Sequence, residues 1–239
     1  MSKIEAFLRN IVRSLLSKLS TQMCKRILSN ATLHHEYNLS IRQAPQFKDI
    51  HGTWDFALDL IGKDELITYI EFGVFTGRSI KYISSESLNK ESIFLGLDTF
   101  TGLPEDWDTQ GGNLPKGHFS VEGKFPDIKD SRIKFIKGLF QKTSSEWMDI
   151  LLNRKDQILL AHFDADLYSS TLFGLSQIAN TGKPFYCIFD EFYGDECRAF
   201  SDFKSSFRYE SKLLCSGARC YENGAVTQRN ILALVTPLP

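Results

Sequence analysis

Short apolar runs alternate with segments of helical periodicity over most of this chain. Near-continuous apolar strands alternating with helices are typical of a parallel sheet covered on both faces. The predicted strands that follow this pattern are 66–72, 92–98, 133–136, 157–168 and 184–191. The predicted helices between and after them are 80–85, 144–152, 172–178 and 196–209.

Two shorter apolar runs close the chain, 213–215 and 230–235, with a polar turn between them. Strands joined in this way pair antiparallel, so we place them at the edge of the sheet. The pattern therefore predicts an α/β fold with a mostly parallel seven-stranded sheet and helices on both faces.

The N-terminal segment 3–27 repeats apolar residues at the i, i+3, i+4, i+7 spacing of an amphipathic helix, with basic residues between them. One interpretation is a membrane-surface helix or a targeting segment, because the segment is basic and nearly free of acids. The pattern favours a helix packed on its own domain or on a second subunit, because most amphipathic helices are packed. We predict a helical extension over 1–50, a second domain over 51–239, and a possible homodimer through this helix.

Charge and composition exclude several classes of protein. The chain has 28 basic and 29 acidic residues among 239, so no overall charge attracts nucleic acid. No apolar stretch approaches the ~20 residues of a transmembrane helix. Five cysteines without a C-x-x-C pair argue against a disulfide framework and a thiolate zinc site. We expect a cytoplasmic protein with reduced cysteines.

The first strand of the domain ends in an acid and a glycine turn. Glu71 is followed by Gly73 and Gly77, and a helical segment begins close behind. Glycines at the carboxyl end of a parallel strand let backbone amides approach a ligand. A plain strand-to-helix turn is the alternative. The dinucleotide fingerprint G-x-G-x-x-G is absent because Phe75 replaces its second glycine, which disfavours a nicotinamide dehydrogenase.

The second strand also ends in an acid. Asp98 follows Glu71 by 27 residues, about the separation at which nucleotide-binding α/β units place a carboxylate on the ribose hydroxyls. The alternative is a turn residue or a helix cap. The long glycine- and proline-rich connection 102–126 then predicts a flap that faces the substrate.

Acids also follow the fourth and fifth strands, in Asp164-x-Asp166 and Asp190-Glu191. In a parallel sheet these ends open on one crevice, so the carboxylates converge and need a counter-ion. Oxygen ligands without matching Cys or His fit Mg²⁺ better than Zn²⁺, and a nearby carboxylate can then take a proton from a coordinated hydroxyl. The alternative is that these acids are turn residues and helix caps.

Five ordered motifs resemble the macrocin O-methyltransferase family, a branch of the class I S-adenosylmethionine-dependent methyltransferases that act on sugar or antibiotic hydroxyls with Mg²⁺. These motifs are YIEFGVFTGRS at 69–79, GLDTFTGLPEDW at 96–107, KGLFQKT at 137–143, DADLYSST at 164–171 and FDEFY at 189–193. The resemblance covers about residues 66 to 200 and implies a Rossmann-like fold, S-adenosylmethionine as cofactor and a small-molecule or glycan acceptor.

The resemblance also implies a role for individual residues. The cofactor loop would be formed by Glu71, Gly73, Gly77 and Ser79, with Asp98 on the ribose hydroxyls. The metal ligands would be Asp164, Asp190 and Glu191, although Glu191 stands where the family usually carries Asp or Asn. The catalytic pair would be Asp164 as base and Asp166 in support. The substrate contacts would be Trp107, His118 and Tyr168.

Two other functions compete with methyl transfer to a hydroxyl. A metal-dependent glycosyltransferase could use Asp164-x-Asp166 for a nucleotide-sugar, but it leaves Glu71 and Asp98 without a role. A non-catalytic cofactor-binding subunit is the second alternative, and Glu191 favours it.

Overall fold

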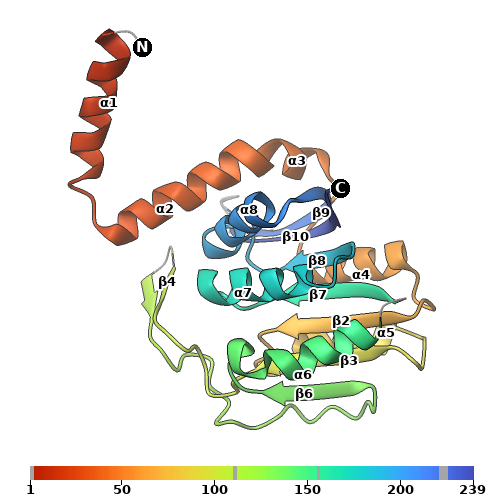
Figure 1. Ribbon diagram of the computed structural model, residues 1–239. Helices are drawn as coiled ribbons and strands as arrows, with labels where there is room; N and C mark the ends of the chain where they lie inside the picture. The colour runs from red at the N-terminus through yellow and green to blue at the C-terminus, as the bar shows by residue number, and fades with distance from the viewer. Residues whose placement is uncertain (1–2, 110–111, 155–156, 221–225) are drawn as a thin grey trace.

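The computed structural model describes residues 3–109, 112–154, 157–220 and 226–239. The described residues form one large sheet with helices on both faces, a small two-stranded sheet, and an N-terminal helix that projects away from the rest (Figure 1). None of the helices in these ranges is both long enough and apolar enough to cross a membrane.

The large sheet has eight strands in the order β1-β9-β10-β8-β7-β2-β3-β6. Its strands are β1 (Gln46–Phe47), β2 (Ile67–Phe72), β3 (Ile93–Asp98), β6 (Ile133–Lys137), β7 (Ile158–Phe163), β8 (Phe185–Phe189), β9 (Tyr209–Cys220) and β10 (Val226–Pro237). The five strands from β8 to β6 are parallel, and β10 pairs antiparallel with β8 and with β9. The predicted mostly parallel α/β sheet is confirmed.

The sheet differs from the prediction at its antiparallel edge. The two-residue strand β1 pairs in parallel with β9 and adds an eighth strand. Strands β9 and β10 also extend far beyond the short apolar runs at 213–215 and 230–235. Backbone pairing between the two strands continues past the apolar positions, which is why the apolar pattern underestimated their length.

Eight α-helices are described, with a five-residue π-helical turn, Leu33–Tyr37, between α2 and α3. They are α1 (Lys3–Leu16), α2 (Thr21–Thr32), α3 (Asn38–Gln43), α4 (Ile50–Ile61), α5 (Arg78–Glu86), α6 (Phe140–Asn153), α7 (Tyr168–Ala179) and α8 (Asp195–Phe207). Separate apolar clusters fill the two faces of the sheet. The helices therefore cover both faces, as the alternating pattern predicts.

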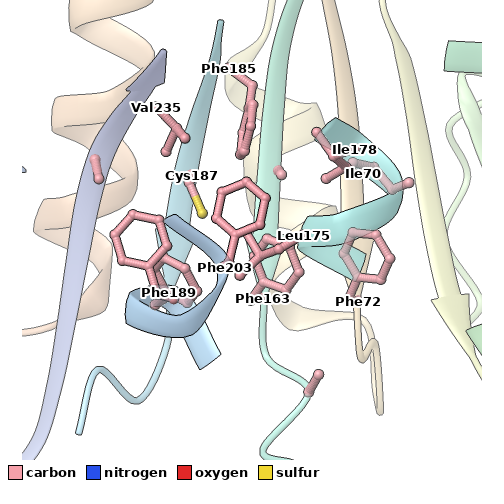
Figure 2. Close-up of a cluster of buried hydrophobic side chains, with 14 of the residues drawn as sticks. Ile70, Phe72, Phe163, Leu175, Ile178, Phe185, Cys187, Phe189, Phe203 and Val235 are labelled. Carbon is pink, nitrogen blue, oxygen red and sulfur yellow. The ribbon is translucent and has the colours of Figure 1, made fainter. Parts of the chain in front are cut away.

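A row of phenylalanines marks the ends of the three central strands (Figure 2). Phe72 ends β2, Phe163 ends β7 and Phe189 ends β8, and they are paired in register across the sheet. The rings stack, with centroids 4.8 Å apart between Phe72 and Phe163 and 5.3 Å apart between Phe163 and Phe189. Gly174 of α7 lies directly on this row, since a Cβ there would come within 2.8 Å of the Phe163 ring. The row thus fixes where the three strands end relative to one another.

The N-terminal segment forms two helices where the periodicity predicts one. Helix α1 ends at Leu16, and α2 begins at Thr21 with Ser20 as its N-cap. The Ser20 hydroxyl accepts a hydrogen bond from the amide of Met23 at 3.2 Å, which satisfies one of the free amides of a helix start. The spacing of apolar residues continues through the break, so it gives no sign of the helix start that the polar side chain of Ser20 caps.

Helix α2 is tied to the 102–126 connection. This connection contains a small hairpin of β4 (Trp107–Thr109) and β5 (Gly112–Leu114). The Arg26 guanidinium donates to Asp108 Oδ1 at 2.8 Å and to the carbonyl oxygen of Thr109 at 2.6 Å. The N-terminal extension is therefore bound to the predicted flap through Arg26 of α2 and the strand β4.

Replacing Arg26 by alanine is expected to loosen β4. A partly exposed ion pair at the surface is worth about 1 kcal/mol, so we expect about a five-fold rise in amide hydrogen exchange over 107–109 with little change in global stability. Hydrogen exchange measured by mass spectrometry checks this. The control is Lys134→Ala, which removes the 2.8 Å ion pair to Glu146 elsewhere on the surface. Equal exchange at 107–109 in both variants would contradict the tie.

Candidate active site

A cavity of about 560 Å³ lies beyond the carboxyl ends of the central strands. Its walls come from the loops after β2, β3, β7 and β8, from the start of α6 and from the flap. Its described lining carries six carboxylates and no lysine, arginine or histidine: Asp98, Glu105, Asp164, Asp166, Asp190 and Glu191. A cavity of this size and charge suits a small cationic or hydroxyl-rich ligand.

The glycine turn after β2 forms one wall. Gly73 has φ +93°, and a Cβ at this position would overlap the carbonyl oxygen of Asp164. Only glycine lets β2 and β7 end this close together. The neighbouring Phe75 also has positive φ and packs its ring edge-on against Phe119 of the flap, with centroids 5.6 Å apart. The turn therefore joins the acids of β7 to the flap.

Asp98 at the end of β3 holds this turn in place. Its Oδ2 accepts hydrogen bonds from the amides of Val74 at 2.8 Å and Phe75 at 2.9 Å, and its Oδ1 accepts one from Phe100 at 2.6 Å. Asp98 also lines the cavity. The predicted ribose ligand is thus also the carboxylate that shapes the glycine turn.

Three residues predicted for the cofactor loop lie behind the cavity wall. Glu71 is fully buried, accepts a hydrogen bond from the hydroxyl of Ser79, and has its Oε1 3.5 Å from Nδ1 of His162. Gly77, at φ +79°, is the N-cap of α5. It lies so close to Pro126 that a Cβ on Gly77 would come within 2.8 Å of that side chain. None of these three lines the cavity, so the structure places them in support of the turn.

The acids after β7 and β8 form one cluster. Burial, reinforced by the charge of Asp190, raises the pKa of Asp164 and of Glu196 well above the usual range of a carboxyl. The same two causes raise the pKa of Glu191 to about 7. Glu196 lies in the first turn of α8 and accepts a hydrogen bond from the amide of Glu191 at 3.0 Å. A carboxylate with a raised pKa is suited to take a proton near neutral pH.

Asp166 occupies an unusual backbone conformation within this cluster. Its φ is +61°, in the left-handed region that favours glycine. Burial raises its pKa, and the neighbouring Glu191 adds to the shift. Non-glycine residues held in this conformation are concentrated at active sites, because the surrounding structure must support them.

The predicted metal ligands meet at the cavity, but they do not form a preorganised metal site. Asp164, Asp190 and Glu191 all line the cavity, and their oxygens have the donor chemistry of a hard cation. Within the described ranges, however, no three His, Cys, Asp or Glu side chains are arranged to hold a metal ion. The donor chemistry of these residues fits Mg²⁺, but their positions would have to change for the three to hold the ion together.

A second cavity of about 320 Å³ adjoins the first between α2, the flap and the start of α8. The two cavities share lining residues from the flap, from α7 and from the loop after β8: Glu105, Trp107, Ser169 and Glu191. Its wall includes Tyr168, over whose ring the Arg198 guanidinium lies 4.1 Å from the centroid. The two acids Glu105 and Glu191 and the indole ring of Trp107 therefore belong to the walls of both cavities.

The predicted substrate contacts are divided between these cavities. Trp107 lines both and Tyr168 lines the second, whereas His118 lines neither and packs against the ring of Phe119 at 4.3 Å.

Sequence reasoning missed several lining residues. Two of them lie inside motifs that the sequence shows: Phe75 in the glycine motif at 69–79, and Gln141 in the motif at 137–143. No role was assigned to either residue. Lys25 and Arg26 line the second cavity from α2, and only the tertiary structure brings them there.

The family comparison gives one match. A family model described as Macrocin-O-methyltransferase (TylF) matches residues 63–215, which is more than half of the chain. Comparison with curated proteins gives no match. The family match does not favour the glycosyltransferase or the non-catalytic alternative.

Several solved methyltransferase structures are similar to this chain. The structure of the O-methyltransferase NovP superposes with a TM-score of 0.52 at 16% identity, with 79% of each chain covered. An O-methyltransferase from Bacillus cereus, in complex with SAH, has a TM-score of 0.46 at 11% identity and covers 95% of this chain and 96% of its own. TomG from Streptomyces achromogenes, in complex with SAM, has a TM-score of 0.46 at 12% identity and covers 99% of this chain and 100% of its own. The likeness to NovP shows a class I methyltransferase fold.

Replacing Gly73 by alanine is expected to disrupt the turn. The left-handed conformation costs an alanine about 1–2 kcal/mol, and relieving the overlap with Asp164 adds about 1–3 kcal/mol. Urea unfolding checks the sum. The control is Gly182→Ala, which has φ +66° but open space around its Cβ and should show the conformational cost alone. Equal losses in the two variants would show that the close approach to Asp164 is not limiting.

Proposed function

We propose that this chain, which belongs to the macrocin O-methyltransferase family and is an S-adenosylmethionine-dependent O-methyltransferase, methylates a hydroxyl of a sugar or of a glycosylated small molecule. The observation that carries the proposal is the pair of adjoining cavities that share Glu105, Trp107 and Glu191 in their walls. The first would hold the methyl donor and the second the acceptor.

The first cavity suits the donor in shape and in charge. S-adenosylmethionine, when bound, supplies a methyl group on a cationic sulfonium. Six carboxylates without a basic side chain in the described lining favour such a cation. Asp98 would accept hydrogen bonds from the ribose hydroxyls while it keeps the amides of Val74 and Phe75 in place.

The second cavity suits a carbohydrate. Its lining combines the aromatic rings of Trp107, Tyr168 and Tyr193 with carboxylates that include Asp195. Aromatic faces cover the apolar CH face of a sugar, and carboxylates accept hydrogen bonds from its hydroxyls. The acceptor would reach the donor where the cavities meet, at Trp107 and Glu191.

The reaction is one displacement with one proton transfer. The acceptor oxygen attacks the methyl carbon as the carbon–sulfur bond breaks, and the hydroxyl proton passes to a carboxylate. Asp164 is the proposed base, because it lines the first cavity and burial raises its pKa towards the working range of a general base. Asp166 would hold this segment in its strained conformation, so positioning and electrostatics supply most of the catalysis.

Metal assistance is a separate part of the proposal. Asp164, Asp190 and Glu191 would hold Mg²⁺, which when bound would lower the pKa of an acceptor hydroxyl. The support is the donor chemistry of these acids, which line one cavity together. The ligand positions would have to adjust on binding.

Calorimetric titration tests the choice of ligand. We expect the purified protein to bind S-adenosylhomocysteine and to ignore UDP, each measured with and without Mg²⁺. Binding of UDP alone, dependent on the metal, would replace the proposal with a glycosyltransferase.

The substitution Asp98→Ala is expected to weaken S-adenosylhomocysteine binding by at least about ten-fold, because it removes a ribose ligand and frees two amides of the turn. The same titration measures it. Asp149→Ala, on the exposed face of α6, is the control. An unchanged affinity in the Asp98 variant would remove Asp98 from the site.

The substitution Asp164→Asn is expected to lower kcat by about 10²–10⁴-fold while S-adenosylhomocysteine still binds, because the amide cannot take the proton. Turnover with a sugar acceptor measures it, and Asp149→Asn is the control. Full activity in Asp164→Asn would exclude Asp164 as the base.

A further inference from the structure

Helix α1 exposes an apolar face that no described part of the chain covers. Its exposed large apolar side chains are Phe7, Ile11, Val12, Leu15 and Leu16, with Phe7 65% and Leu15 60% exposed. Figure 1 shows α1 projecting away from the sheet and from α2. Of the two packing arrangements predicted for this segment, α1 does not show packing on its own domain, and packing on a second subunit stays a prediction.

The pattern on α1 is that of a helix lying in an interface. At about 100° per residue, the five exposed apolar side chains spread over about half of the helix circumference. The basic residues Lys3, Arg9 and Arg13 occupy the other half, with Arg9 and Lys3 at its two borders. Basic side chains in these positions can reach past the apolar face to lipid headgroups.

The length of α1 indicates that its apolar face has a partner. A 14-residue helix is marginal in water when it stands alone. An amphipathic helix gains its stability mainly from burial of its apolar face. Covering this face would therefore stabilise α1.

Charge and length favour an anionic surface over a second copy of the chain. Residues 3–18 carry four basic residues and one acidic residue, so two facing copies of α1 would repel each other. The 14 residues of α1 supply only two heptads, fewer than the three or four that identify a coiled coil. The wide apolar face also differs from the narrow seam of such a pair.

We propose that α1 docks the enzyme on a membrane surface that contains anionic lipid, lying in the headgroup plane with Phe7 and Leu15 inserted. Insertion of the apolar face and attraction of the basic residues act together, as weak interfacial binding requires. This proposal does not depend on the identity of the acceptor.

Vesicle flotation of the full-length protein tests the proposal. We expect binding to phosphatidylcholine vesicles that contain phosphatidylglycerol, weaker binding to phosphatidylcholine alone, and release at high salt. In the double variant Arg9→Gln, Arg13→Gln, vesicle binding should weaken about five-fold for each arginine replaced. Leu15→Glu should abolish insertion, whereas Leu88→Glu, at an exposed leucine on another surface, should bind as the native chain does.

Two further measurements keep the result interpretable. All variants should retain their affinity for S-adenosylhomocysteine, which shows that the methyltransferase domain is folded. Light scattering without vesicles should give a monomer. A dimer that dissociates on Leu15→Glu would assign the face to a second copy and overturn the proposal, as would equal binding to neutral and anionic vesicles or no binding to either.

Discussion

The stacked row of Phe72, Phe163 and Phe189 is the contact on which the site depends. These residues end three neighbouring parallel strands and are paired in register, so the next residue of each strand reaches the same edge of the sheet. The ladder continues beyond the row, where the amide of Asp164 donates to the carbonyl oxygen of Phe72 at 3.0 Å and the amide of Asp190 to that of Phe163 at 2.9 Å. The apolar packing of the three rings thus fixes where the strands end, and with that it determines which carboxylates meet at the carboxyl edge of the sheet.

Bringing these carboxylates together has an electrostatic cost, because each one disfavours the charged form of the others. Burial raises the pKa of Asp164, Asp166 and Glu191, since each charged form is poorly solvated and repelled by its neighbours. A cationic ligand relieves that repulsion, whether it is a sulfonium or a metal ion. The same raised pKa prepares a carboxyl to hold a proton, so in the proposed reaction one arrangement would serve both donor binding and proton transfer.

The N-terminal helices serve different purposes although they share one apolar periodicity. Helix α2 joins the body of the protein, where Arg26 holds β4 and borders the second cavity. Helix α1 leaves the body and keeps its apolar side chains exposed. The short break before α2, whose N-cap is Ser20, separates a helix that lines the second cavity from one whose apolar side chains are exposed.

The sequence by itself determined which segments form the parallel strands, because strands buried on both faces need continuous apolar runs. It also determined which acids stand at the strand ends, since these residues follow directly after the apolar runs. It also identified the family through five short motifs. Only the tertiary structure decided that Glu71 lies behind the cavity wall, that Asp98 shapes the glycine turn and that Arg26 reaches the flap. These contacts join segments far apart in the chain and depend on backbone conformations and packing distances, which apolar periodicity does not encode.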